Sequence, residues 1–236
     1  MKYKVRCSEL STLLDGCGKV KNKLEWDELD KMNDSHIKLA IKIYNKVQNR
    51  FEPADVDTLD MRAGTLQEKA AFQMYDEHFG TNFVNYQKER LSNDWIEGER
   101  DAGDNSITID CKISTDKNVF DAKRFAKTQD VGYIIQLNGY GWLYNTPKLQ
   151  LFNALMPPLP EQIDKMVRDK LWACKLDLIE EQAYRDKLES SYFYDFYPVK
   201  LRIQTHDIPV IENFQEIVKK RVEIMNEWID KNMKGY

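Results

Sequence analysis

The chain has 236 residues, enough for one large domain with a buried core. Hydrophobic residues make up 42% and charged residues 31%, which excludes a disordered chain, and a net charge of −4 excludes a globally basic nucleic-acid binder. The four cysteines and three histidines lack the spacing of zinc or iron–sulfur sites. We see neither a signal peptide nor a run of about 20 apolar residues, so we expect a soluble protein of the cytoplasm without membrane contact.

The N-terminal region is predicted to be helical. Residues 8–15, "SELSTLLD", form a short helix opened by Ser8. Residues 23–49 carry a longer helical pattern in which Ile37, Ala40 and Tyr44 lie on one stripe.

A helix followed by strands comes next. The helix covers roughly 64–79, and the strands lie near 82–88, 93–101 and 106–113. The turn residues of "AGDNS" separate the last two strands, which should therefore form a hairpin.

The rest of the chain alternates helices and strands. Residues 133–145 indicate a helix, with a strand as the alternative, and "MPPLP" at 156–160 indicates a linker. A long charged helix at 161–190, a strand near 197–205 and an amphipathic helix at 212–232 follow. This order favours an α/β fold with a layered core and helical additions at both ends.

The strand "ITIDCKIST" carries an unusual polar pair. Apolar residues alternate with polar ones, so one face points to a core, while Asp110 and Lys112 share the other. An acid-x-lysine triplet alone is most often a solvated strand face with a weak ion pair.

The hairpin turn adds a second carboxylate to this face. If the turn spans 103–105, Asp101 lies opposite Asp110, and two carboxylates that close repel unless a cation lies between them. Lys112 provides one positive charge, and a divalent metal provides more. Oxygen ligands are those that Mg²⁺ or Mn²⁺ prefers.

Three further side chains have two interpretations each. Glu68 either faces the strands or closes a capping box with Thr65, depending on where its helix begins. Gln136 and Tyr140 are four residues apart and share a face if their segment is helical, but Tyr140 is as well explained by packing.

Taken in order, Glu68, "GERD", "DCK" and "QLNGY" resemble the motifs of the PD-(D/E)XK nuclease superfamily, and more narrowly the RecB-like branch with YqaJ-like phage exonucleases related to lambda exonuclease. The similarity covers most of the chain, from "VRCSELSTLL" to "RIQTHDIPVIENFQEIVKKRV". One departure is Asp110, where the superfamily more often has glutamate; the resemblance implies a tolerated variant whose shorter side chain weakens metal binding.

The resemblance implies a restriction-endonuclease-like core, a mixed central sheet flanked by helices, in a single nuclease domain of residues 1–236. The core would span about 60–155, with a helical region at 1–55 and a helix-strand-helix region at 160–236. It also implies Mg²⁺-dependent hydrolysis of DNA phosphodiesters, with Mn²⁺ as the alternative ion. The implied metal ligands are Glu68, Asp101, Asp110 and the backbone carbonyl of Cys111.

The other motif residues take supporting roles under this resemblance. Lys112 would position the attacking water and stabilise the transition state, and Gln136 and Tyr140 would orient water, lysine or DNA backbone.

Candidate DNA contacts lie on either side of these motifs. The basic residues between the lysine and glutamine motifs could form a phosphate-contacting strip or simply a solvated helix face; they are Lys117, Lys123, Arg124 and Lys127. Ser8 and Arg6 resemble the family's 5′-phosphate-binding region, although a helix-capping role explains Ser8 better.

The resemblance alone implies polarity and partners. It suggests a 5′→3′ exonuclease on linear double-stranded DNA in phage-type recombination, acting in the bacterial host cytoplasm with a single-strand-annealing recombinase. A homo-oligomer is expected, a trimer by resemblance. The alternatives are an endonuclease on the same core, a DNA-binding protein without catalysis, and, least favoured, a structural protein.

Overall fold

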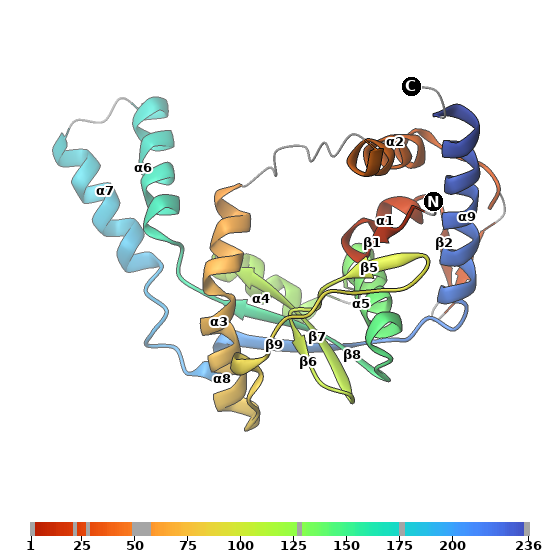
Figure 1. Ribbon diagram of the computed structural model, residues 1–236. Helices are drawn as coiled ribbons and strands as arrows, with labels where there is room; N and C mark the ends of the chain where they lie inside the picture. The colour runs from red at the N-terminus through yellow and green to blue at the C-terminus, as the bar shows by residue number, and fades with distance from the viewer. Residues whose placement is uncertain are drawn as a thin grey trace.

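The largest sheet of the molecule has four strands in the order β6-β7-β8-β9 (Figure 1). The computed structural model describes residues 3–20, 23–26, 29–48, 58–126, 129–174 and 178–233. The strands of this sheet are Ala102–Gly103, Ile107–Ser114, Lys148–Leu155 and Ile203–Ile208. β7 and β8 run parallel, and the two outer strands are antiparallel to their neighbours. The sheet is therefore mixed, as predicted.

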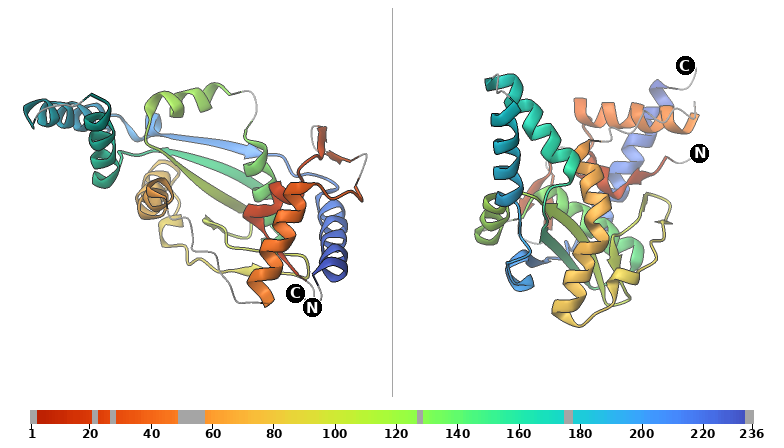
Figure 2. Two further views of the ribbon diagram at one scale, coloured as in Figure 1. Left: turned by 90° about the horizontal axis from the view of Figure 1, so that it is seen from above. Right: turned by 90° about the vertical axis from the view of Figure 1, so that its left-hand side faces the viewer.

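Helices cover both faces of this sheet (Figure 2). α3 (Leu59–Phe79) packs Phe72 and Tyr75 against Ile109, Cys111 and Phe152. On the opposite face, α5 (Val131–Tyr144) contributes to a core cluster that includes two leucines of β8, and α4 (Lys117–Phe125) packs on β7 and β8. The alternation of β7 thus buries its apolar face under α3 and turns its polar face toward α5, and the predicted α/β class is confirmed.

The N-terminal part adds two small sheets and two helices. β1 (Val5–Arg6) pairs parallel with β5 (Ile96–Gly98), and β5 pairs antiparallel with β4 (Leu91–Ser92). A 3₁₀ turn, η1, and a short helix, α1, confirm the helix predicted near residues 8–15; their bounds are Cys7–Glu9 and Leu10–Leu13. The second sheet is the hairpin of β2 (Gly18–Val20) with β3 (Lys23–Glu25).

Two helices begin at other residues than the sequence pattern indicates. α2 (Asp34–Gln48) begins at Asp34, not near residue 23, because Asn33 and His36 cap each other. The His36 amide donates to Asn33 Oδ1 at 2.9 Å, and the Asn33 amide donates to His36 Nδ1 at 3.0 Å. α3 begins five residues early, where the Thr58 hydroxyl accepts a hydrogen bond from the Met61 amide.

Two strand predictions are wrong. Residues 82–88 contain no strand; η2 (Phe83–Asn85) forms there because the Asp76 carboxylate accepts hydrogen bonds from the Phe83 and Val84 amides. The strand expected at 93–101 is confined to β5, which pairs with β1 and β4 and not with β7; the hairpin partner of β7 is β6, inside the segment predicted as the turn. β8 was not predicted at all, since it is buried on both faces and shows no alternation.

The C-terminal part contains a projecting pair of helices. α6 (Pro160–Cys174) follows the predicted linker, and α7 (Leu178–Ser191) packs against it, so the single helix expected at 161–190 is two helices. α8 (Val199–Arg202) precedes β9, so the strand begins later than predicted, and α9 (Phe214–Asn232) confirms the final amphipathic helix. α9 packs on α2, away from the projecting pair (Figure 1). None of the helices within the described residues is long and apolar enough to cross a membrane.

Candidate active site

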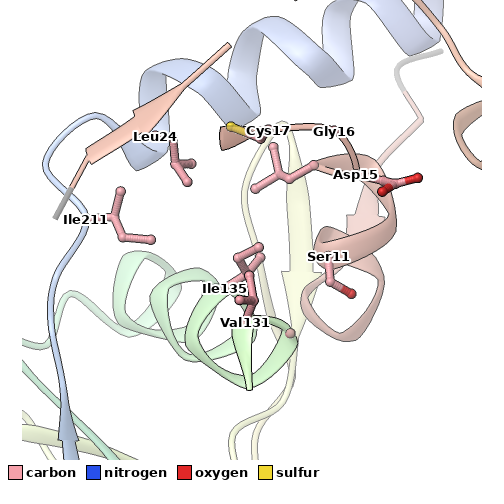
Figure 3. Close-up of a pocket in the computed structure, with 10 residues that line it drawn as sticks. Ser11, Asp15, Gly16, Cys17, Leu24, Val131, Ile135 and Ile211 are labelled. Carbon is pink, nitrogen blue, oxygen red and sulfur yellow. The ribbon is translucent and has the colours of Figure 1, made fainter. Parts of the chain in front are cut away.

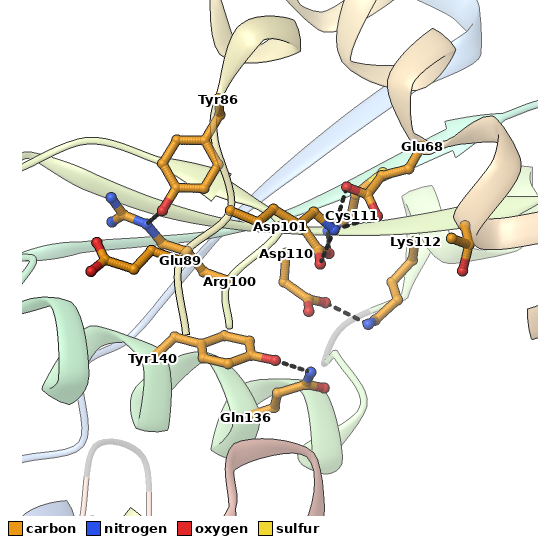
Figure 4. Close-up of polar contacts among 12 residues, drawn as sticks. Glu68, Tyr86, Glu89, Arg100, Asp101, Asp110, Cys111, Lys112, Gln136 and Tyr140 are labelled. Atoms are coloured by element: carbon orange, nitrogen blue, oxygen red, sulfur yellow. Dashed lines mark hydrogen bonds and ion pairs between the residues drawn. The ribbon is translucent and has the colours of Figure 1, made fainter. Parts of the chain in front are cut away.

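Asp110 and Lys112 lie side by side on the polar face of β7, the face turned toward α5 (Figure 4). Asp110 is only 1% exposed, and its Oδ2 lies 2.7 Å from Lys112 Nζ. The same ammonium group lies 4.7 Å from the centre of the Tyr133 ring of α5, a contact that the sequence did not indicate. β7 therefore presents the predicted acid–lysine pair from a rigid central strand.

The hairpin turn brings Asp101 to the same place. Ala102 pairs with Ile109, so the antiparallel register places Asp101 opposite Asp110, as predicted. β6 begins at the next residue, Ala102, and Asp101 Oδ2 accepts a hydrogen bond of 2.7 Å from the Cys111 amide. The Asp101 carboxylate thus takes the place of a backbone carbonyl as the acceptor for this amide of β7.

Glu68 reaches the site from α3 (Figure 4). Because the helix begins at Leu59, Glu68 lies well inside it, and the capping box with Thr65 is wrong: the Thr65 hydroxyl donates to the Met61 carbonyl instead. Glu68 Oε1 lies 2.7 Å from the ammonium nitrogen of Lys88, which also lies 3.6 Å from Asp101 Oδ1. Lys88 is a charged member of the site that the sequence did not indicate.

The charge of Asp101 raises the pKa of both Glu68 and Asp110, in each case after burial. Burial raises the pKa of Asp110; Lys112 opposes this rise, and Asp101 and Glu68 add to it. Burial and then Asp101 raise the pKa of Glu68, while Lys88 opposes the rise. Burial disfavours the charged form of Lys112, but Asp110 outweighs it, so the lysine pKa is raised. The site concentrates negative charge that two ammonium groups offset.

The carboxylates do not stand ready around an open position. Among the described residues, no group of three or more His, Cys, Asp or Glu side chains is placed to hold a metal ion. Lys88 Nζ lies between Glu68 and Asp101 instead, and Lys112 Nζ occupies the other side of the site, 2.7 Å from Asp110 Oδ2. The donor set and its charge suit a hard divalent cation, provided that Lys88 moves.

Gln136 and Tyr140 lie on α5, facing β7 (Figure 4). The helix is confirmed, and Gln136 Nε2 donates a hydrogen bond of 2.9 Å to the Tyr140 hydroxyl. Tyr140 is also 6% exposed, and a Cβ atom on Gly98 would meet its ring at 2.8 Å, so the ring packs tightly against the β5 backbone. Burial, with a contribution from Asp110, raises the pKa of Tyr140 and keeps its hydroxyl protonated. Tyr140 both packs and presents a polar atom to the site.

Comparison with known proteins identifies the fold of the chain through solved structures alone. Neither a protein-family model nor a curated protein sequence matches the chain. A phage-related exonuclease from Haemophilus somnus 129PT aligns with a TM-score of 0.72 and 23% identity, covering 99% of this chain and 96% of that one. An alkaline exonuclease from Laribacter hongkongensis aligns at a TM-score of 0.63 and 9% identity, over 98% and 90% of the two chains. The same enzyme in complex with dAMP aligns at a TM-score of 0.61.

The chain has the fold of these exonucleases.

On this exonuclease fold, the basic residues predicted as one strip point in different directions. Lys117 pairs with Asp121, and Arg124 is exposed. Lys123 turns inward, where its ammonium donates to Ser114 Oγ at 3.0 Å and lies 3.5 Å from Asn153 Oδ1. Burial and the nearby Lys112 lower its pKa. Lys127 lies outside the described residues, so of the four only Lys123 is shown beside the catalytic candidates.

The two N-terminal candidates lie on β1 and η1. Arg6 ends β1, with its Nε 3.8 Å from Glu97 Oε1, and Ser8 is exposed on η1. Arg6 is the N-cap residue of η1 and Glu9 is that of α1, so Ser8 caps neither helix and the capping role expected for it is wrong. η1 packs against both α5 and β5, which places Ser8 near the elements that carry the site.

Arg100 fixes the hairpin that carries Asp101. It is 6% exposed, and its guanidinium lies 4.2 Å from the Tyr144 ring centre. Nε donates to the Tyr86 hydroxyl at 2.9 Å, and Nη1 donates to the Asp104 carbonyl and the Thr108 hydroxyl at 3.0 and 3.1 Å. Arg100 thus ties the turn to β7 and to the segment after η2 that carries Tyr86.

We expect Arg100→Met to lower the free energy of unfolding by about 3 kcal/mol, because buried hydrogen-bond acceptors lose their donor. Urea denaturation measures the change, and Arg90→Met, at an exposed position, is the matched control. A loss below about 1 kcal/mol, within the effect of an ordinary substitution, would contradict this role of Arg100.

A separate pocket lies on another side of α5 (Figure 3). It encloses about 260 Å³ between α1, β3 and the start of α5, and Leu14, Leu24 and Ile135 are among the apolar residues lining it. Asp15 is the one charged side chain in this lining. With so few polar groups, the pocket lacks the chemistry of the carboxylate site.

Proposed function

We propose that the protein is a metal-dependent DNA exonuclease that hydrolyses phosphodiester bonds from the ends of linear double-stranded DNA. The observation that carries this proposal is the meeting of Glu68, Asp101, Asp110 and Lys112 at one place. These residues come from α3, the hairpin and β7, in a fold shared with exonucleases. That one neighbour was solved with dAMP is consistent with a nucleotide site in this fold.

Four groups would hold the cation: the carboxylates of Glu68, Asp101 and Asp110, and the Cys111 carbonyl. Mg²⁺ is the proposed ion and Mn²⁺ the alternative, since both prefer oxygen ligands. When bound, such an ion activates water and neutralises charge on the phosphate.

The remaining side chains act on the substrate directly. The Lys112 ammonium, held by Asp110 and the Tyr133 ring, would orient the attacking water and stabilise the negative charge that develops on the phosphate. The Gln136–Tyr140 pair supplies an amide and a hydroxyl that orient water or DNA backbone from the α5 side. Lys123, Arg6 and Ser8 are proposed to contact phosphates beside the site, as are Lys117, Arg124 and Lys127.

Polarity, assembly and partners belong to the same proposal. We propose 5′→3′ digestion, a homo-oligomer, a single-strand-annealing recombinase as partner and a role in phage-type recombination in the bacterial cytoplasm. The sequence resemblance supports these points.

Removal of the cation is expected to abolish nucleotide release. Linear duplex DNA labelled at either the 5′ or the 3′ end should release mononucleotides with Mg²⁺, with the 5′ label appearing first. EDTA should lower the rate by at least about a hundredfold, and excess Mg²⁺ or Mn²⁺ should restore it. Cleavage of closed circular DNA would instead indicate an endonuclease. A protein that binds DNA but releases no nucleotides with either ion would be a binding protein without catalysis.

A further inference from the structure

Lys88 reaches into the carboxylate site from the segment between η2 and β4. Its ammonium nitrogen lies 2.7 and 2.9 Å from the two carboxylate oxygens of Glu68 and 3.6 Å from Asp101 Oδ1. Burial disfavours the charged form of Lys88, but the nearby acids Glu68, Asp101 and Glu99 outweigh burial. Together they raise the pKa of Lys88. The side chain stays 37% exposed, so one end of it can move into solvent.

This ammonium group and a divalent cation need the same oxygens. Glu68 and Asp101 come from different elements and repel each other, and Lys88 now neutralises them. A cation bound to these two carboxylates brings two positive charges to the position that Lys88 occupies, so the ammonium must leave. The long, flexible lysine side chain can do so without a change of the backbone.

We propose that Lys88 is a tethered counter-ion of Glu68 and Asp101 which a divalent cation displaces, and that the displaced ammonium then binds a DNA phosphate beside the site. The inference rests on the proposed nuclease function and extends it to the coupling between the two ligands. Lys88 weakens cation binding when DNA is absent and strengthens DNA binding when the cation is present. By linkage, DNA and the cation then favour each other's binding.

Cation affinity without DNA tests the first half of this proposal. Mn²⁺ binding can be followed by the electron paramagnetic resonance signal of the free ion, which does not depend on activity. We expect Lys88→Met to bind Mn²⁺ about tenfold more tightly than the wild-type protein, because the competing charge is gone. Lys88→Arg keeps the charge and should retain the wild-type affinity.

Lys42→Met is the matched control. Lys42, on α2, also forms a 2.7 Å ion pair with a glutamate, but its partner is Glu9 and not one of the proposed metal ligands, so its removal should leave Mn²⁺ affinity unchanged. An unchanged or weaker Mn²⁺ affinity in Lys88→Met would overturn the proposal.

DNA affinity tests the second half. The affinity for linear duplex DNA should rise on addition of Ca²⁺, an ion used here to support binding without rapid cleavage, and this rise should be several-fold smaller in Lys88→Met. A full Ca²⁺-dependent rise in that variant would overturn the phosphate contact. If the wild-type protein digests DNA but Lys88→Met matches it in both assays, only this inference fails. A wild-type protein that binds no Mn²⁺ and releases no nucleotides refutes the proposed function as well.

Discussion

Lys112→Met is expected to slow the release of nucleotides from linear duplex DNA by about a thousandfold, while duplex affinity changes only a few-fold. Lys112 Nζ is held 2.7 Å from Asp110 Oδ2 on β7, and under the proposed function this ammonium would stabilise the charge that develops during hydrolysis. Methionine keeps most of the aliphatic chain and its packing near Tyr133 but removes that charge. Single-turnover rates with Mg²⁺, and binding measured in Ca²⁺, separate the two effects.

The control for this variant is Lys148→Met. Lys148 begins β8 on the same sheet and forms an exposed ion pair with Asp207. Lys148→Met therefore removes the same charge as Lys112→Met without changing a residue of the site. Its rate should stay within about twofold of the wild type, as expected for a surface substitution. If Lys112→Met kept more than a tenth of the wild-type rate, the catalytic role of Lys112 would be wrong.

The local features of this site were predictable from the sequence. Alternation over residues 107–113 and the turn residues before it determine the strand, the hairpin and the opposition of Asp101 to Asp110. The four-residue spacing of Gln136 and Tyr140 predicts their shared face once the helix is accepted. Each of these signals depends on residues close together in the chain.

Features that depend on distant contacts were not predictable. β8 carries no alternation because both of its faces are buried, so only its pairing with β7 and β9 identifies it as a strand. Lys88 enters the site because α3 packs over the hairpin and brings Glu68 to it, and nothing in "YQKERL" indicates this. Likewise, Lys123 and Arg124 are adjacent in sequence, yet only Lys123 turns toward β7 and β8.

The three acids meet as predicted, but lysine side chains and not an open cation position lie between them. Asp101 and Glu68 do raise the pKa of Asp110, but Lys88 and Lys112 lie among the three acids. Sequence order can identify which carboxylates meet, whereas the charge that balances them comes from whichever cation the fold brings near. The metal-binding role of Glu68, Asp101, Asp110 and Cys111 stays a prediction.

Asp110→Asn should abolish nucleotide release and yet stabilise the cation-free protein at alkaline pH. Burial raises the pKa of Asp110, so the folded state keeps this proton at pH values where the unfolded chain has lost it. The free energy of unfolding should then fall as the pH rises from the ordinary carboxyl range through the raised pKa. The pKa of Lys112 is also raised, but it changes the free energy of unfolding only at pH values above the ordinary lysine pKa. It therefore does not alter the pH dependence expected from Asp110.

Asparagine removes the buried charge, so the variant should lose this part of the pH dependence. Near pH 8 in EDTA we expect it to be more stable than the wild type by on the order of 2 kcal/mol, with little difference near pH 5. Urea denaturation at both pH values measures the change, and Asp169→Asn on the exposed side of α6 is the control. A variant less stable than the wild type at both pH values would mean that the ion pair with Lys112 outweighs the cost of burial. A stabilised variant would show instead that the protein keeps a destabilising carboxylate at the position where the proposed cation needs one.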